Sequence, residues 1–163
     1  MSRVQLAINV GDIDAAIEFY SKLFNAQPAK IRDGYANFAI AEPPLKLVLI
    51  AGSGTPGTLN HLGVEVMSQD EVGAAITRLQ GEGLATTVET NTSCCYAVQD
   101  KVWVHGPDAE PWEVYTVLAD APSMTKVAAA GESACCTPAP AAEAACCTPA
   151  ATETVSLTAK ACC

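Results

Sequence analysis

The chain contains an internal repeat, which restricts its fold to a duplicated module. The segment QLAINV at residues 5–10 aligns with HLGVEV at 61–66, and PLKLVLIA at 44–51 aligns with PWEVYTVLA at 111–119. The first two segments alternate apolar and polar residues as half-buried strands do, and a stretch with helical spacing follows each of them. Because self-similarity marks a repeated supersecondary unit, we expect both halves of the chain to form the same unit.

Each predicted helix has start and stop signals. Asp12 precedes IDAAIEFYSKLF, and Ser68 precedes QDEVGAAITRL with Glu71 placed as in a capping box. The turn formers that end the two helices are Asn25, Gly81 and Gly83. Three strand-like runs follow in each half, at 29–32, 35–41 and 45–51, and at 85–90, 95–104 and 112–118. The expected fold class is therefore α+β, with the unit βαβββ present twice.

The two modules predict one domain followed by a tail. Modules at about 1–52 and 58–119 would pack into a single domain, residues 1–120, around a curved cavity lined by both sheets. Every Trp, Tyr and Phe lies at or before Tyr115, whereas residues 121–163 are mostly Ala, Pro, Thr, Ser, Glu and Cys. A segment without aromatic residues buries too little surface to offset the entropy lost on ordering. We expect a flexible Cys-rich tail at 121–163.

The repeat brings four polar strand positions to the expected cavity. Gln5 aligns with His61, and Lys46 aligns with Glu113. An imidazole, a carboxylate and an amide oxygen resemble the facial triad of Fe(II) oxygenases with one His replaced by Gln, whereas a cationic lysine is a poor ligand. Metal ligation by Gln5, His61 and Glu113 is the hypothesis, and a half-buried histidine beside an edge-strand glutamate is the alternative. His105 precedes a turn signal and is interpreted as a loop residue.

All eight cysteines occur as adjacent pairs. Neighbouring cysteines bridge each other poorly, because their Cα atoms lie about 3.8 Å apart, which is below the usual disulfide range. Two adjacent thiolates are better suited to clamping one soft ion, and trivalent arsenic is an obvious candidate. The pairs are Cys94-Cys95, Cys135-Cys136, Cys146-Cys147 and Cys162-Cys163.

Charge and hydropathy exclude several classes of partner. The net charge of −9 and the absence of a Lys/Arg cluster argue against nucleic-acid binding. The longest apolar stretch, LKLVLIAG at 45–52, is too short for a membrane span and contains a lysine. No secretion signal is recognisable at the N-terminus, so a reducing cytoplasm is expected, and a secreted disulfide scaffold has no support.

Several of these segments together resemble a known family. They are QLAINVGDIDAAIEFYSKLF, GYANFAIAEPPLKLVL, TLNHLGVEV, CCYAVQDKVWV and PWEVYTVLA. They are similar to the organoarsenical carbon–arsenic lyases, also called cadmium-induced proteins, of the vicinal oxygen chelate superfamily, over residues 1–119. The resemblance implies a vicinal oxygen chelate fold and an Fe(II)-dependent, dioxygen-consuming enzyme that converts trivalent methyl- or aryl-arsenicals to arsenite. It implies metal ligation by Gln5, His61 and Glu113, and substrate binding by Cys94-Cys95.

A mechanism consistent with the resemblance uses Cys94, Cys95 and Tyr96 as catalytic residues. We expect the thiols to begin a strand after a loop at 89–93 and to orient the arsenic toward the metal. Tyr96 would donate a hydrogen bond to bound oxygen, or else be a core tyrosine. Two alternatives remain at this point: a protein that sequesters arsenite or cadmium through its thiols, including those of the tail, or a dioxygenase or isomerase of the same superfamily with a carbon substrate.

Overall fold

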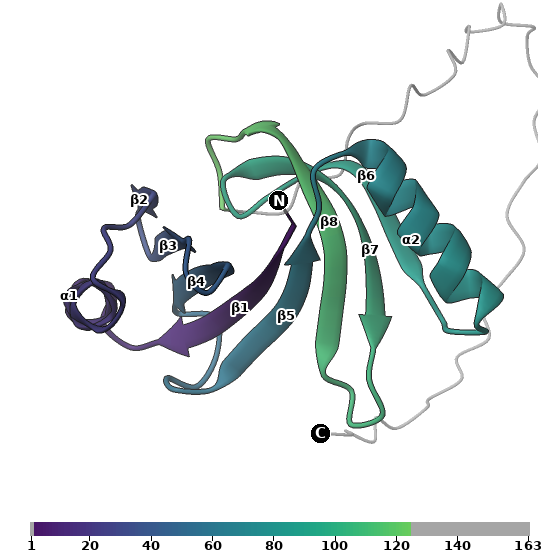
Figure 1. The fold of residues 1–163 in the computed structure, drawn as a ribbon. Coiled ribbons are helices and arrows are strands. Elements are labelled where there is room, and N and C mark those ends of the chain that lie inside the picture. The colour runs from purple at the N-terminus through teal and green to yellow at the C-terminus, as the bar shows by residue number, and fades with distance from the viewer. Residues whose placement is uncertain (1, 125–163) are drawn as a thin grey trace, which may run out of the picture. The chain divides into compact units, whose positions relative to one another are not determined.

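The computed structural model describes residues 2–124, which form a curved sheet and two helices (Figure 1). The sheet has eight strands in the order β2-β3-β4-β1-β5-β8-β7-β6. The elements are β1 (Arg3–Val10), α1 (Ile13–Phe24), β2 (Lys30–Arg32), β3 (Tyr35–Ile40), β4 (Leu45–Ala51), β5 (Leu59–Glu65), α2 (Gln69–Gly81), β6 (Thr87–Cys94), β7 (Ala97–His105) and β8 (Pro111–Asp120).

The element order repeats the unit βαβββ, as the sequence predicts. β1 pairs in parallel with β4, and β5 pairs in parallel with β8. The antiparallel pair β1–β5 joins the two modules at the centre of the sheet. Both parallel strands of each module therefore lie next to the junction, where the cavity-facing side chains of the two modules meet.

The predicted helix signals are confirmed. The Asp12 carboxylate accepts hydrogen bonds from the first turn of α1, which ends at Asn25 in the left-handed conformation, φ 46°. The Ser68 hydroxyl accepts from the Glu71 backbone N–H, 3.2 Å away. The Glu71 carboxylate in turn accepts from the Met67 backbone N–H at 2.7 Å, one residue before the position expected of a capping box.

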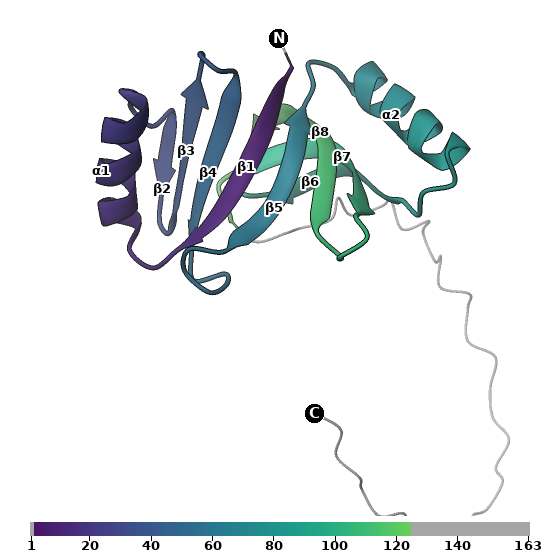
Figure 2. The same ribbon diagram turned by 60° about the horizontal axis from the view of Figure 1, so that its bottom comes forward.

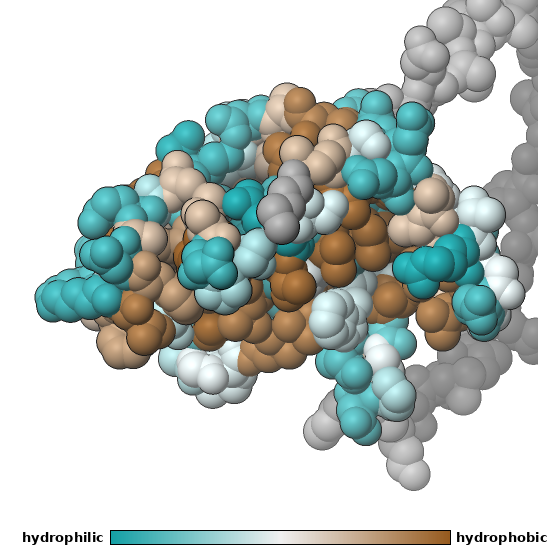
Figure 3. Space-filling model, in the orientation of Figure 1, coloured by the Kyte–Doolittle hydropathy of each residue, from teal (hydrophilic) through white to brown (hydrophobic). Residues whose placement is uncertain are grey.

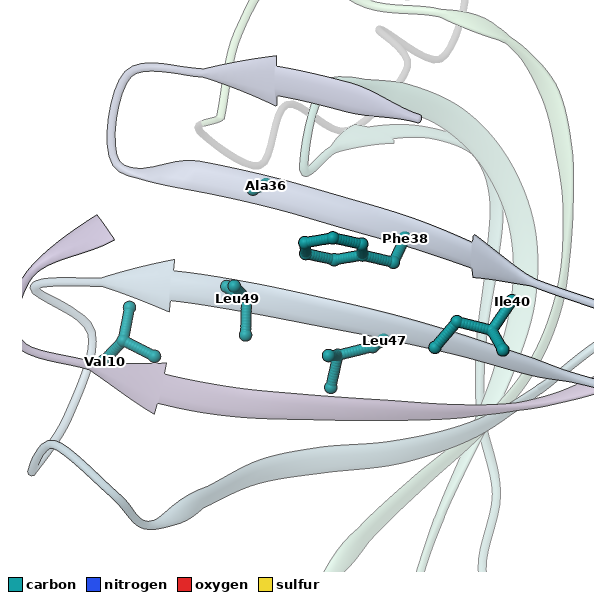
Figure 4. Close-up of a cluster of buried hydrophobic side chains, with 6 residues drawn as sticks. All are labelled: Val10, Ala36, Phe38, Ile40, Leu47 and Leu49. Atoms are coloured by element: carbon teal, nitrogen blue, oxygen red, sulfur yellow. The ribbon is translucent and has the colours of Figure 1, made fainter. Parts of the chain in front are cut away.

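Each helix covers the strands of its own module (Figure 2). α1 packs on β3 and β4, and α2 packs on β7 and β8. The core under α1 consists of apolar side chains from β1, β3 and β4 (Figure 4), namely Val10, Ala36, Phe38, Ile40, Leu47 and Leu49. Side chains alternate along a strand. The two residues of β4 that flank Leu47, which are Lys46 and Val48, therefore lie on the opposite face of the sheet and line a cavity.

No helix in residues 2–124 is long and apolar enough to cross a membrane. The exposed large apolar side chains are spread over several elements and include Phe19 and Leu23 on α1, Met67 before α2, and Val117 and Leu118 on β8. In the view of Figure 3, polar and apolar residues are mixed over the surface.

The structure corrects two expectations about chain segments. The region 89–93 is part of β6 instead of a loop, and Cys94 ends that strand instead of beginning the next one. The predicted start of the tail, residue 121, lies too early in the chain. Ala121 is buried, and the carbonyls of Ser123 and Met124 accept backbone hydrogen bonds from the turn between β6 and β7. The expected role of Cys135, Cys136, Cys146, Cys147, Cys162 and Cys163 in binding arsenite or cadmium lies outside the described residues.

Candidate metal and thiol site

One row of residues across the sheet builds the centre of the site. Gln5 pairs with Lys46 on one side and with Gly63 on the other, and Gly63 pairs with Glu113. A Cβ at Gly63 would lie 3.1 Å from Glu113 Cγ and 3.3 Å from Gln5 Cβ. The missing side chain at Gly63 therefore lets Gln5 and Glu113 meet over this strand.

The three predicted ligands converge within hydrogen-bonding distance of one another. Gln5 Nε2 lies 2.9 Å from His61 Nε2 and donates to Glu113 Oε1 at 2.8 Å. His61 Nε2 lies 3.4 Å from the same Glu113 oxygen. Within residues 2–124 no three His, Cys, Asp or Glu side chains cluster as a metal site. A site with three protein donors here would accordingly need the Gln5 amide.

The spacing of these atoms fits a metal ion. Donors at about 2.1 Å from a metal and at right angles to each other lie about 3.0 Å apart. The amide would have to present its oxygen, and a half-turn of the terminal amide exchanges Nε2 with Oε1. The Tyr115 hydroxyl, which now donates to Gln5 Oε1 at 2.5 Å, could then accept from Nε2. The residues present therefore fit a divalent cation held by two neutral donors and one carboxylate.

A polar network fixes the orientation of His61. Its Nδ1 lies 2.7 Å from Asn60 Oδ1. The Asn60 amide nitrogen donates to Asn9 Oδ1 at 2.8 Å and to Ser53 Oγ at 3.0 Å, so the Asn60 oxygen has to face the histidine. Nδ1 then carries the proton, and Nε2 presents its lone pair to the ligand cluster.

Two buried lysines neutralise the carboxylates around the site. Lys101 Nζ lies 2.7 Å from Glu113 Oε2, and both side chains are 3% exposed. Burial raises the pKa of Glu113, but its interactions with His61 and with the charge of Lys101 outweigh burial and hold that pKa below its usual value. Lys46 pairs with Glu65 at 3.0 Å. Because Lys101 occupies Oε2, Glu113 offers only Oε1 to a metal.

The thiol pair lies in a strained two-residue turn. Cys94 pairs with Ala97 across the β6–β7 hairpin, and the connecting residues Cys95 and Tyr96 have φ 57° and 60°. Positive φ at both connecting residues is the type I′ geometry, which Asn and Gly usually supply. Backbone bonds hold the turn: Cys95 N–H donates to Met124 O at 3.3 Å, and Tyr96 N–H donates to Ser123 O at 3.1 Å. Strain of this kind is characteristic of functional sites.

The two sulfurs are free and interact with each other. Cys94 Sγ lies 2.9 Å from Cys95 Sγ. The hydrogen bond from Cys95 lowers the pKa of Cys94 to about 7, against the effect of burial and with help from the Lys101 charge. The same hydrogen bond, together with burial, raises the pKa of Cys95. The pair therefore holds one thiolate and one thiol near neutral pH.

Thiols and metal donors open into one cavity of about 350 Å³. Its walls include Gln5, Tyr35, Lys46, Val48, Ile50, Ser53, Asn60, His61, Cys94, Cys95, Gln99, Lys101, Trp103, Glu113 and Met124. Tyr96 is not among the lining residues, and its hydroxyl donates to the Asp33 carbonyl at 3.1 Å while its ring packs on Tyr35. This placement favours the core-tyrosine interpretation. His105 is exposed at the end of β7, also outside the cavity lining.

A comparison with known families places the fold. A family model described as the Glyoxalase/Bleomycin resistance protein/Dioxygenase superfamily matches residues 3–114, more than half of the chain. The chain belongs to this superfamily. The predicted vicinal oxygen chelate fold, with two βαβββ modules around a shared cavity, is thereby confirmed.

Named relatives match most of the chain. It is 64% identical over 139 residues to a trivalent organoarsenical cleaving enzyme of Thermomonospora curvata, covering 85% of this chain and 90% of that protein. It is 68% identical over 120 residues to the cadmium-induced protein CadI of Mycobacterium tuberculosis, covering 74% of this chain and 79% of that one. The predicted resemblance to this branch of the superfamily is confirmed.

Solved structures of low sequence identity share the fold alone. An extradiol ring-cleaving dioxygenase from B. fuscum superposes with a TM-score of 0.54 at 16% identity, covering 75% of this chain and 34% of that one. A Mn(II)-bound glyoxalase from Novosphingobium aromaticivorans gives a TM-score of 0.53 at 19% identity, covering 74% of this chain and 42% of that one.

Four residues of the site were not identified from the sequence as partners of the metal donors: Asn60, Gly63, Lys101 and Tyr115. Alternation along the strands could have identified two of them. Gly63 shares a face of β5 with His61, and Lys101 shares a face of β7 with Trp103. The pairing of Lys101 with Glu113 depends on how β7 and β8 are aligned, and nothing in the sequence specifies that alignment.

Proposed function

We propose that this protein cleaves the carbon–arsenic bond of trivalent organoarsenicals, with methyl or aryl substituents, and leaves arsenite. The observation that carries the proposal is the shared cavity, which places two free vicinal thiols and a cluster of metal-donor side chains around one space. The names of the relatives support this chemistry, because three of them are called trivalent organoarsenical cleaving enzymes, one with the qualifier probable.

The thiols bind the substrate by exchange. A trivalent organoarsenical with two hydroxyls reacts with two cysteines to give a dithiolate in which arsenic keeps its organic group, and two waters leave. Cys94 is the first nucleophile, because its thiolate is available near neutral pH. The Cys95 thiol, 2.9 Å away, donates its proton to one departing hydroxyl and forms the second As–S bond, while the other hydroxyl takes a proton from solvent. Holding both sulfurs in one turn replaces a bimolecular encounter with a positioned one.

The donor cluster supplies the second half of the site. Gln5, His61 and Glu113 would hold Fe(II), which when bound provides a redox-active ion with coordination positions left for dioxygen. The Asn60 network keeps His61 Nε2 unprotonated, and Lys101 keeps Glu113 ionised and bound through one oxygen. The apolar residues Val48, Ile50 and Met124 form a wall on which the organic substituent can pack.

The experiment combines metal, oxygen and thiol requirements. Protein loaded anaerobically with Fe(II) is mixed with a trivalent organoarsenical, and arsenite is measured before and after air is admitted. Arsenite should appear only after air, and the zinc-loaded protein should produce none because zinc has no accessible redox state. Cys94→Ser and Cys95→Ser should each abolish turnover but keep Fe(II) bound, with Ser93→Ala as the matched control.

Other outcomes would favour the alternatives. Arsenical binding that is independent of Fe(II) and yields no new arsenic species would indicate a sequestering protein. Turnover of a carbon substrate by the double serine variant would indicate another reaction of the superfamily. Full cleavage by the zinc form, or by the Fe(II) form without oxygen, would refute the oxidative mechanism.

A further inference from the structure

Gln99 places an unpartnered amide oxygen at the wall of the cavity. The residue is 5% exposed and lies on β7. Among residues 2–124, only two buried side-chain polar atoms have no hydrogen-bond partner, Gln99 Oε1 and Ser21 Oγ. Ser21 belongs to α1 and is not part of the cavity lining, whereas Gln99 is. Leaving a buried carbonyl unpaired is unfavourable, so a ligand that donates a hydrogen bond to it would recover this energy.

Strand geometry puts this amide next to the thiols. Cys94 is directly opposite Ala97 in the β6–β7 hairpin, so both side chains lie on the same face. Gln99 and Lys101 follow on that face, and Gln99 is about 7 Å from Ala97 along the strand. Gln99 therefore lies between the thiol pair and the Lys101–Glu113 ion pair. Its terminal torsion is soft and roughly two-fold, so the oxygen can turn toward a ligand at low cost.

The other polar groups of the wall are already engaged with each other. Lys46 and Lys101 pair with carboxylates, and Asn60 bonds to His61 and Ser53. A ligand held by the thiols can satisfy Gln99 only if it carries a donor. Arsenite does so, since its reaction with two cysteines releases two waters and leaves one hydroxyl on arsenic. An organoarsenical dithiolate has no such hydroxyl.

We propose that the Gln99 amide oxygen accepts a hydrogen bond from the hydroxyl of arsenic held by Cys94 and Cys95. The inference rests on the proposed function in that it assigns the thiols to arsenic. The Gln99 hydrogen bond distinguishes arsenic that bears a hydroxyl from arsenic that bears an organic group. Gln99 is therefore a specificity-determining residue on the product side of the reaction.

The test uses metal-free, reduced full-length protein in which the six tail cysteines are serine. Dissociation constants are measured for inorganic arsenite and for phenylarsonous acid, together with the thermal midpoint without ligand. Gln99→Met should weaken arsenite binding about three- to tenfold and leave phenylarsonous acid binding unchanged. Its thermal midpoint should stay the same or rise, because the variant removes an unpaired buried group. Gln27→Met, at an exposed position, is the control.

Three results would overturn the assignment: equal weakening for both arsenicals, unchanged arsenite binding, or a lowered thermal midpoint in Gln99→Met and in Gln99→Leu. The last result would mean that the amide has a structural partner. The proposed function fails separately. If the Fe(II) protein produced no arsenite in air while the arsenite-specific loss in Gln99→Met persisted, cleavage would be refuted and the Gln99 contact would stand.

Discussion

Removing residues 121–131 is expected to release the thiol turn while the sheet stays folded. The relevant comparison is between chains that end at Asp120 and at Gly131, where the first compact unit of the chain ends. The shorter chain keeps all eight strands but loses the partners of three backbone hydrogen bonds. These are Cys95 N–H to Met124 O, Tyr96 N–H to Ser123 O and Ala121 N–H to Tyr96 O.

The size of the effect follows from these bonds and from the strain that they oppose. Three backbone hydrogen bonds contribute roughly 0.5–1.5 kcal/mol each, or about 3 kcal/mol together. Left-handed φ values cost roughly 1–2 kcal/mol for each of Cys95 and Tyr96. The two sums nearly balance, so losing the bonds leaves only the contacts of Tyr96 with Lys30 and Tyr35 to oppose the strain. A loss of about 3 kcal/mol shifts the equilibrium between the held and the relaxed turn roughly a hundredfold.

Amide hydrogen exchange at Cys95 and Tyr96 measures the turn directly. Exchange at both amides should accelerate by up to two orders of magnitude in the chain ending at Asp120, while amides of β1 and β5 keep their protection. The affinity of this shorter chain for a trivalent arsenical should also fall, because both thiols must be held together to bind arsenic. The chain ending at Gly131 should match the full-length protein in exchange. Equal protection in the two truncated chains would refute the reasoning, and so would a general loss of protection across the sheet.

Alkylation of Cys94, followed by peptide mass spectrometry, should accelerate about tenfold per pH unit up to about pH 7 and then level off, because its thiolate forms with a pKa of about 7. In Cys95→Ala the pH at which the alkylation rate levels off should rise toward 9.0, the ordinary pKa of a cysteine thiol. An unchanged profile would exclude the sulfur–sulfur hydrogen bond as the cause of the lowered pKa. Gly63→Ala should lower divalent-metal affinity tenfold or more, since its Cβ would lie 3.1 Å from Glu113 Cγ. Metal titration checks this, and Gly73→Ala, which has open space around it, is the control.

The convergence of Gln5, His61 and Glu113 was predictable because the information that determines it is local and periodic. Alternation along a strand fixes which face a side chain occupies, and the repeat indicates which strands are equivalent. Those two facts are enough to bring Gln5, His61 and Glu113 to one face. They do not fix the register: Lys46 pairs with Gln5 itself, whereas Glu113 pairs with Gly63, two residues beyond His61. A shift of two residues keeps the face, so the prediction tolerated it.

The position of the thiol turn was predicted wrongly because it depends on tertiary contacts and not on local periodicity. Alternation places Cys94 on a strand but does not indicate where the strand ends, and Cys95-Tyr96 has none of the Asn or Gly residues that mark a type I′ turn. The turn exists because tertiary contacts hold it, above all the backbone bonds to Ser123 and Met124. Those partners lie in a segment whose composition favours disorder, so sequence reasoning assigned them to the tail.

The position of the thiols over the metal donors depends on contacts between the two modules. A straight strand would separate Ala97, opposite Cys94, from Trp103, opposite Glu113, by about 20 Å. The β7–β8 register shifts between Val98 and Gln99, where Leu118 of β8 is the extra residue, and such a bulge bends the sheet locally and increases its twist. The bent hairpin tip then docks on the first module. Lys30 Nζ donates to the Tyr96 carbonyl at 3.1 Å, and the Tyr96 ring lies 5.5 Å from that of Tyr35. Tyr96 thus anchors this hairpin tip on the first module, and each module depends on the other to bring the thiols over Gln5, His61 and Glu113.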